Sequence, residues 1–97
     1  MKYLLGIDFG GGASKATLLC ENGEIAAKNT TEYPTNYPAP GYAEQNPKDW
    51  LDATVKNIKD LLDKSGVIPE DIAAVSMDAA THTAVIMDED LNVIRPA

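Results

Sequence analysis

The sequence predicts an α/β fold in which a mixed β-sheet carries a single helix. Three observations predict it. Short apolar runs have the composition of buried strands, turns that contain glycine join the first three runs, and one amphipathic helix separates the third run from the fourth. Because a crossover through a helix is right-handed and returns in the same direction, the fourth strand should lie parallel to the first.

The first three strands are expected to form an antiparallel meander. Their ranges are Tyr3–Ile7, Lys15–Cys20 and Glu24–Thr31. The first run is apolar throughout, as in a strand buried on both faces, whereas the third becomes polar toward its end. A glycine triplet joins the first two strands, and Asn22-Gly23, a pair typical of tight turns, joins the second to the third.

Residues 32–46 are expected to form a loop, since three prolines and one glycine in fifteen residues prevent a helix. Tyr33, Tyr37 and Tyr42 are interleaved with the prolines. These tyrosines either pin the loop to the body of the protein through their rings or form a binding platform, and we favour the first interpretation.

A helix is expected from Pro47 to Lys64. Asn46 is a good N-cap, proline suits the first helical position, and Ser65-Gly66 ends the helix. Acidic and basic residues four positions apart predict a solvated face and not a site. The apolar face is predicted to include Leu51, Val55, Ile58 and Leu62, with Trp50, Thr54 and Leu61 beside it.

A buried strand is expected over Ile72–Met77, followed by a hairpin with strands at Thr83–Met87 and Leu91–Ile94. The acidic turn at 88–90 is interpreted as a solvated tip and not as a metal cluster, because adjacent side chains cannot all converge on one ion. His82 is the only histidine. It is either a residue at the strand edge whose ring is satisfied by backbone, or a ligand-binding residue.

Composition narrows the class of protein. The chain of 97 residues has room for one small domain, and its net charge of −7 argues against a nucleic-acid surface. The single cysteine, Cys20, cannot form an internal disulfide. The apolar run at the N-terminus is too short for a signal peptide or a membrane span, so a cytoplasmic protein without membrane partners is expected.

The residues around the glycine turn are the main candidates for a functional site. Asp8 precedes the triplet Gly10-Gly11-Gly12, and Ser14 and Lys15 follow it. Glycines let backbone N–H groups turn toward one point and let an anion approach closely. A carboxylate beside such a turn suits Mg²⁺, which takes one or two carboxylates together with substrate phosphates. The turn thus predicts a metal and a phosphate, and the alternative is a hairpin turn with an incidental acid.

Two stretches resemble known families. Gly6-Ile7-Asp8-Phe9-Gly10, followed by Ser14-Lys15-Ala16, resembles the first phosphate-binding hairpin of the actin-like ATPase superfamily of sugar kinases, chaperones and actin. The segment from Pro40 to Pro47, with Asp49-Trp50 after it, resembles the signature of the FGGY carbohydrate kinases. Tyr42 stands there for the usual tryptophan and Asn46 for the usual aspartate. The resemblance implies a ribonuclease H-like (actin-like ATPase) fold.

The resemblance also implies ATP and Mg²⁺ as cofactors in phosphoryl transfer to a sugar hydroxyl. Asp8 would hold Mg²⁺ through water. In this chain Gly10-Gly11-Gly12 replaces the usual Gly-Thr-Thr or Gly-Thr-Ser, so the backbone N–H groups of Gly10, Gly11 and Gly12 would meet the β- and γ-phosphates, with the Ser14 hydroxyl beside them. Lys15 would neutralise phosphate, or it is a surface residue of the strand.

A third stretch indicates the sugar. Val75 to His82, with Met87-Asp88 after it, resembles the Gly-Gln-Met-His-Gly segment of the xylulose kinases, in which the Met-His pair meets the sugar. Thr81 falls on the methionine position and His82 on the histidine position, whereas Ala80 departs from the usual glutamine. Thr81 and His82 are therefore expected to hold a pentulose such as xylulose, with Asp78 as a further polar contact.

The family's chains are several times longer than this one. Residues 1–97 are thus expected to be the N-terminal part of the first sugar kinase domain, with the catalytic base and most of the adenine pocket in the rest of the kinase chain. On its own this part should show no catalytic activity, because it lacks the base. The sheet supports this expectation, because one helix can cover only one of its two faces.

Two other classes of protein remain open. One is an actin-like ATPase that hydrolyses ATP without a sugar. The other is a non-catalytic binding module, in which the glycines are only a turn and the uncovered sheet face lets the chain self-associate as a homodimer.

Overall fold

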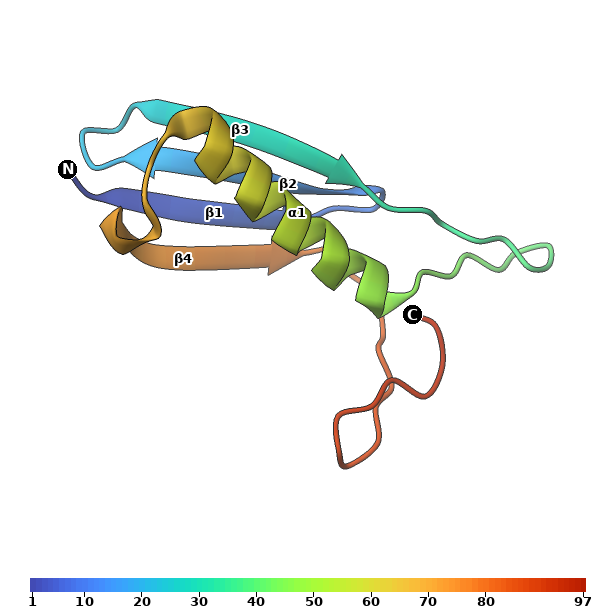
Figure 1. Ribbon diagram of the computed structural model, residues 1–97. Helices are drawn as coiled ribbons and strands as arrows, with labels where there is room; N and C mark the ends of the chain where they lie inside the picture. Colours follow the sequence, from blue (N-terminus) through green and yellow to red (C-terminus); the bar gives the residue numbers. More distant parts are fainter.

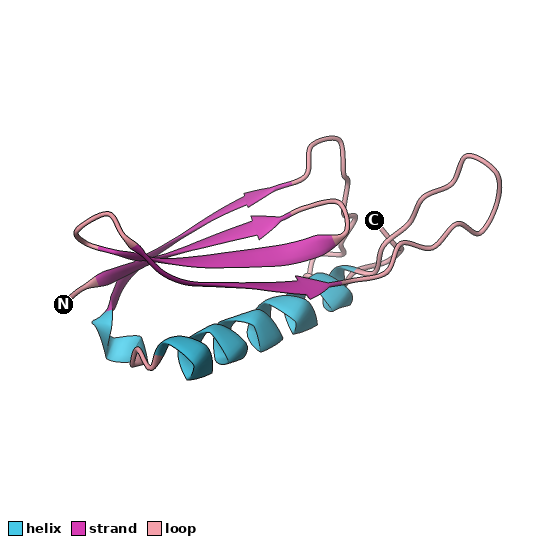
Figure 2. Ribbon diagram, turned by 90° about the horizontal axis from the view of Figure 1, so that it is seen from above, coloured by secondary structure: helices cyan, strands magenta, loops and turns pink.

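The computed structural model describes residues 1–97 as a four-stranded sheet with one helix on one of its faces (Figure 1; Figure 2). The sheet order is β3-β2-β1-β4. Its elements are β1 (Tyr3–Phe9), β2 (Ala13–Cys20), β3 (Ile25–Glu32), α1 (Pro47–Ser65), the single 3₁₀ turn η1 (Pro69–Asp71) and β4 (Ile72–Ala79).

The strand pairing confirms the predicted meander and crossover. β1 pairs antiparallel with β2, and β2 pairs antiparallel with β3. β4 pairs parallel with β1, so that Asp8 faces Asp78 across the two strands. β1 is longer than predicted and extends to Phe9, which places Asp8 inside the strand and not at its end.

The caps of α1 follow the sequence signals. The Asn46 side chain accepts a hydrogen bond from the Lys48 backbone N–H at 3.0 Å. Gly66 adopts the left-handed conformation, with φ of 74°, and its N–H donates to the Leu62 carbonyl at 2.9 Å. Lys56 and Asp60 form the ion pair expected on the exposed side, at 2.7 Å.

The buried face of α1 differs from the prediction. Leu51 and Val55, predicted to be buried, are 64% and 46% exposed. The buried residues are Ala53, Thr54, Asn57 and Leu61. The last three each lie one position before a residue of the predicted stripe. The physical reason is that α1 packs over β2 and β3, where polar side chains of the strands require polar partners from the helix.

The apolar core lies between α1 and the middle of the sheet. It consists of Leu5, Ile7, Ala16, Leu18 and Leu61. The core is small, since only 11 of the 97 residues are buried. α1 contacts β2 and β3 but leaves β4 uncovered, and Figure 2 shows that the other face of the sheet has no covering element at all.

The predicted terminal hairpin does not form regular strands. Residues 83–94 fold back on themselves with one isolated bridge between Met87 and Val93, and all of them are exposed. With no neighbouring strand to pair with, this segment projects from the end of β4 (Figure 1). The acidic tip is a turn as expected, because the Asp88 carboxylate accepts hydrogen bonds from the backbone N–H groups of Asp90 and Asn92.

The only helix of length comparable to a bilayer is α1, and it is too polar to cross a membrane.

Candidate functional site

The glycine turn between β1 and β2 exposes two backbone donors. The Gly10 N–H donates to the Ala13 carbonyl at 2.9 Å and closes the turn. This bond corrects the expectation that Gly10 offers its N–H to a phosphate. The N–H groups of Gly11 and Gly12 have no acceptor in the protein. They are the two donors that the turn leaves for a ligand.

The fold itself does not require glycine at these positions. None of the three glycines has a positive φ, in contrast to Gly23 in the next turn. A Cβ added at Gly11 or Gly12 would meet no atom within 4 Å. Neither backbone conformation nor packing demands glycine there, and the absence of side chains leaves the backbone open to close approach by a ligand.

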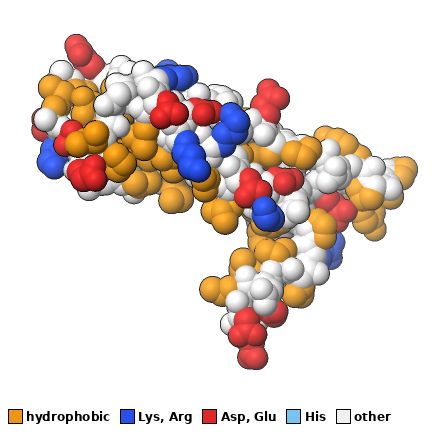
Figure 3. All heavy atoms as spheres, viewed as in Figure 1, with side chains coloured by type: hydrophobic (Ala, Val, Ile, Leu, Met, Phe, Trp, Pro, Cys, Tyr) orange, Lys and Arg blue, Asp and Glu red, His pale blue; other side chains and the backbone are white.

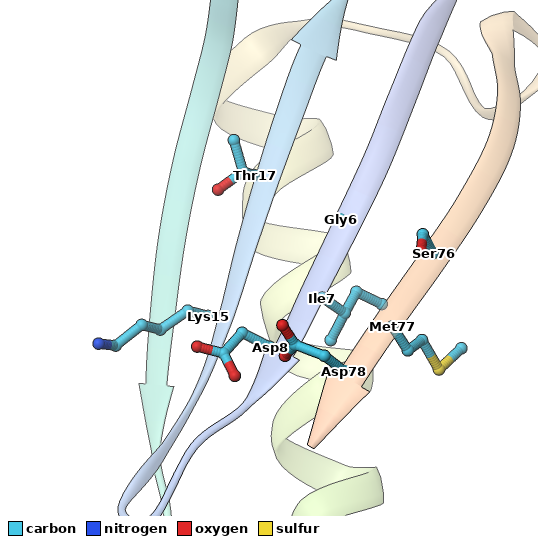
Figure 4. A pocket seen from close by; sticks show the side chains of 8 residues that line it. All are labelled: Gly6, Ile7, Asp8, Lys15, Thr17, Ser76, Met77 and Asp78. Carbon is cyan, nitrogen blue, oxygen red and sulfur yellow. The ribbon is translucent and has the colours of Figure 1, made fainter. Parts of the chain in front are cut away.

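A shallow groove of about 370 Å³ lies over β2, β1 and β4, on the side of the sheet away from α1 (Figure 4). Figure 4 shows the Asp8 and Asp78 side chains close together in it, whereas the Lys15 side chain extends from β2 away from them, over β3. The groove is lined by Gly6, Ile7, Asp8, Lys15, Thr17, Ser76, Met77 and Asp78.

The Asp8 carboxylate raises the pKa of Asp78. The pKa of Asp78 lies above its ordinary value of 3.8, because its protonated form can donate a hydrogen bond to Asp8 and because its ionised form faces the negative charge of Asp8. Two adjacent carboxylates on an exposed groove supply the hard oxygen atoms that Mg²⁺ prefers, and a cation between them would relieve their repulsion. The donor set therefore fits a magnesium ion.

Ser14 is placed differently from the expectation. Its side chain is completely buried on the helix side of the sheet. The hydroxyl lies 3.3 Å from the Thr54 hydroxyl and accepts a hydrogen bond from the Asn57 side-chain amide at 3.2 Å. A hydroxyl with these partners and no access to solvent does not fit a contact to phosphate. Its role in the structure is to join β2 to α1.

Asn57 is a residue that sequence reasoning missed. It is completely buried, and its amide nitrogen also donates to the Ser14 carbonyl at 2.7 Å. Its oxygen accepts hydrogen bonds from Asn29 at 2.6 Å and from Thr31 at 3.1 Å. One side chain thus connects α1 to both strands beside it. A polar residue one position away from the apolar stripe gave no signal of burial.

The loop after β3 reaches back to the glycine turn. The Tyr33 ring is buried and its hydroxyl donates to the Gly10 carbonyl, which confirms for this residue that the loop is pinned by its aromatic ring. Tyr37 and Tyr42 are 74% and 58% exposed and do not pin the loop. Gln45 donates to the Gly11 carbonyl at 2.7 Å. The signature segment around Gln45 is the signal that could have found this contact.

Thr81 and His82 follow β4 at the same end of the sheet as the glycine turn. The His82 ring nitrogen Nδ1 lies 3.1 Å from the Thr81 hydroxyl, and no backbone group satisfies the ring. His82 has a positive φ of 59°, which is uncommon for a residue with a side chain. His82 and Gly11 line a common cavity of about 350 Å³. Asp78 and Asp8 line the separate groove described above.

These features define a class of protein. A meander of three antiparallel strands, a helix and a parallel fourth strand, with an acid beside a glycine turn, form part of an actin-like ATPase fold. The sequence model of the FGGY family of carbohydrate kinases, N-terminal domain, matches residues 3–97. The chain belongs to the FGGY family of carbohydrate kinases.

A xylulose kinase and a glycerol kinase are among the proteins to which the chain is similar. The chain is 38% identical over its whole length to the xylulose kinase of Bacillus subtilis (strain 168), and 36% identical over 88 residues, or 91% of the chain, to a glycerol kinase of Bradyrhizobium sp. (strain BTAi1). It covers 19% and 18% of those proteins. The crystal structure of ligand-bound xylulose kinase from Lactobacillus acidophilus is 32% identical to it, with a TM-score of 0.89 over 99% of this chain and 19% of that one. The chain thus spans about a fifth of the length of the relatives it matches.

Proposed function

We propose that this chain is the N-terminal part of an ATP-dependent carbohydrate kinase that transfers the γ-phosphate of Mg·ATP to a sugar hydroxyl. The observation that carries the proposal is the glycine turn, in which the N–H groups of Gly11 and Gly12 have no partner beside the paired carboxylates of Asp8 and Asp78. Unpaired N–H groups favour anions, and paired carboxylates favour cations. Together they match the two charges of a magnesium nucleotide.

The nucleotide would bind at the turn. The N–H groups of Gly11 and Gly12 would donate to oxygens of the β- and γ-phosphates, and the absence of side chains would let the phosphates come close. Lys15 lies in the same groove as Asp8 and is exposed, so its ammonium is free to swing toward a phosphate. Phosphoryl transfer depends on this kind of positioning and charge stabilisation more than on covalent chemistry.

Asp8 would hold Mg²⁺, through water, with Asp78 beside it in the groove. When bound, the ion neutralises negative charge that develops on the transferred phosphate. Asp8 lies in the middle of the sheet, with β2 on one side and β4 on the other, so its backbone position is fixed. The base that accepts the proton of the sugar hydroxyl would come from the rest of the kinase chain.

Thr81 and His82 would hold the sugar. Both are exposed, and His82 lines a cavity together with Gly11, which brings a sugar contact near a phosphate contact. We propose a pentulose such as xylulose as the substrate. The identity of 38% to a xylulose kinase supports this choice, while the 36% identity to a glycerol kinase makes polyols the class to test against it.

The experiment is ADP release by the kinase that contains this chain, with Mg·ATP and a panel of pentuloses, hexuloses, polyols and a blank without sugar. The proposal predicts ADP with pentuloses only. ADP with polyols instead would retain the kinase and overturn the pentulose. Equal ADP in the blank would identify an ATPase that does not need a sugar.

His82→Ala then tests the sugar site. The variant should raise the KM for the sugar while the KM for ATP stays the same, because His82 is proposed to contact only the sugar. Glu89→Gln, at the exposed tip of the terminal segment, is a matched control that should change neither constant. An unchanged sugar KM in His82→Ala would remove His82 from the site.

A further inference from the structure

All three carbonyl groups of the glycine turn are held by the loop that follows β3. Tyr33 takes two of them, since its hydroxyl donates to the Gly10 carbonyl and its backbone N–H donates to the Gly12 carbonyl at 3.1 Å. Gln45 takes the third, because its Nε2 donates to the Gly11 carbonyl at 2.7 Å. Tyr33 is 23 residues from Gly10 and Gln45 is 34 residues from Gly11 in the sequence. The turn is therefore oriented by a distant segment.

These bonds determine where the free N–H groups point. No peptide bond in the chain is cis, and in a trans peptide the carbonyl and the N–H point in opposite directions. The Gly10 carbonyl shares a peptide plane with the Gly11 N–H, and the Gly11 carbonyl shares one with the Gly12 N–H. Because both carbonyls point toward the loop, both N–H groups point away from it.

The Gln45 amide is itself fixed in orientation. The Trp50 indole nitrogen lies 2.9 Å from Gln45 Oε1, and an indole N–H can only donate. The atom facing Trp50 must therefore be the oxygen, which leaves Nε2 for the Gly11 carbonyl and for the Thr35 hydroxyl at 2.9 Å. The backbone of Gln45 also exchanges two hydrogen bonds with Ala97, at 3.0 and 2.8 Å. The side-chain amide of Gln45 is thus fixed in one orientation by Trp50, Gly11 and Thr35, and the backbone of Gln45 is fixed by Ala97.

Tyr33 is held as a donor by its surroundings. Its side chain is buried, and the pKa of its hydroxyl is raised by burial and by the negative charge of Asp8. The hydroxyl therefore stays protonated and continues to donate to the Gly10 carbonyl.

We infer that Tyr33 and Gln45 are positioning residues for the nucleotide phosphates, acting by holding the carbonyls of the glycine turn so that the Gly11 and Gly12 N–H groups face the ligand. The inference rests on the proposed function of the turn. Donors that already point at the phosphates need no rearrangement when the ligand binds, so the binding energy is not spent on ordering the turn. Trp50 acts one step further away, through Gln45.

The test uses two conservative variants of the kinase that contains this chain. Tyr33→Phe removes one hydroxyl and keeps the ring. Gln45→Glu keeps an oxygen for Trp50 but puts a second carboxylate oxygen against the Gly11 carbonyl. Each variant should raise the KM for ATP and the Kd for Mg·ATP about 3- to 10-fold, the loss expected for one hydrogen bond. The KM for the sugar should not change in Tyr33→Phe, because Tyr33 does not line the cavity that Gly11 and His82 share. Tyr42→Phe, in the same loop but 58% exposed and outside the cavity that Gly11 and His82 line, is the matched control.

The outcomes separate positioning from plain stability. An ATP KM equal to that of the wild type in both variants would overturn the inference. A lower kcat with both KM values unchanged would mean that only the amount of folded enzyme had fallen, and this would overturn it as well.

Calorimetry of Mg·ATP binding without sugar separates the inference from the proposed function. If the wild type binds Mg·ATP but forms no ADP with any sugar, the proposed function fails, and the affinities of the two variants still decide the inference. No binding of Mg·ATP by the wild type would overturn both.

Discussion

The half of the molecule under α1 and the half at β4 are built in opposite ways. Under α1, side chains of β2 are buried and those of β3 are half-buried, and hydrogen bonds join both strands to the helix, with Ser14 and Asn57 completely buried. On β4, Val75 and Met77 are 51% and 64% exposed, and every residue from 73 to 96 is exposed. Figure 3 shows hydrophobic side chains along the β4 edge and on the segment that projects below it.

The difference shows which parts of the site are rigid in this chain by itself. The glycine turn belongs to the covered half, because Tyr33 and Gln45 hold its carbonyls and α1 holds Trp50. Thr81 and His82 belong to the open half, where no packed neighbour fixes them. We therefore expect the proposed phosphate contacts to be formed before a ligand arrives, and the proposed sugar contacts to become ordered only with the rest of the proposed kinase.

The largest effect is expected at Asn57. Asn57→Leu removes four hydrogen bonds, which takes a donor from the buried Ser14 carbonyl and hydroxyl and an acceptor from the half-buried side chains of Asn29 and Thr31. The free energy of unfolding should fall by about 2–4 kcal/mol, measured by urea denaturation of the 97-residue chain. Lys59→Leu, on the exposed side of the same helix, is the control and should change it by less than about 0.5 kcal/mol. Equal stability of the two variants would contradict the description of the covered half.

A smaller effect is expected at Ser14, and it separates a structural role from a phosphate contact. Ser14→Ala removes a buried hydroxyl that lies between Thr54 and Asn57, and it should lower the free energy of unfolding by about 1 kcal/mol. The KM of the kinase for ATP should not change. A higher KM for ATP with unchanged stability would restore the Ser14 hydroxyl to the phosphate site.

Replacing apolar residues of β4 should change the free energy of unfolding of the 97-residue chain only slightly. Val75→Thr and Met77→Gln change side chains that are already largely in water, so the free energy of unfolding should shift by less than about 0.5 kcal/mol. In the longer kinase the same changes should destabilise more, if the rest of the chain covers this face. A loss above about 2 kcal/mol in the 97-residue chain would show that β4 is already packed.

The smallest effect is a pH dependence at the tip of the terminal segment. The pKa of Asp88 is held below its ordinary value of 3.8, chiefly by the hydrogen bond from the Asn92 backbone N–H. A lowered pKa means that the ionised form stabilises the turn. This contribution of the Asp88 carboxylate to stability is fully present above pH 3.8, and it is lost as the pH falls through the lowered pKa.

The backbone amide resonances of Asp90 and Asn92 should accordingly shift on acidification. In Asp88→Ala the carboxylate is absent, so these amides should show no such transition. A transition that persists in the variant would assign it to another group.

The sequence predicts the order and pairing of the first three strands, α1 and β4 well, because these elements depend on local signals. The Asn46 cap, the Gly66 stop and the Asn22-Gly23 turn each act within a few residues, and the parallel return of β4 follows from the crossover through α1. The glycine turn and Asp8 could also be identified as a candidate site from the sequence, since these residues lie in one continuous stretch.

The errors concern contacts between distant segments. The buried face of α1 was misplaced by one position, because hydrophobicity does not reveal that Ser14, Asn29 and Asn57 satisfy one another in the interior. The terminal hairpin was predicted with strands at Thr83–Met87 and Leu91–Ile94, but an isolated two-stranded hairpin is only marginally stable, and this segment forms a single bridge. Only the family signature around Gln45 points to the contact that Gln45 makes with a carbonyl 34 residues away, because local propensities carry no information on it.

The central claim is that nucleotide phosphates bind the N–H groups of Gly11 and Gly12. The most direct measurement is an NMR titration with Mg·ATP of the kinase in which only this 97-residue segment carries ¹⁵N-glycine. The account predicts that the largest shifts occur at Gly11 and Gly12, while Gly23, Gly41 and Gly66, which lie in other turns and caps, stay unchanged. Saturable shifts elsewhere, with the amides of Gly11 and Gly12 unmoved, would contradict it.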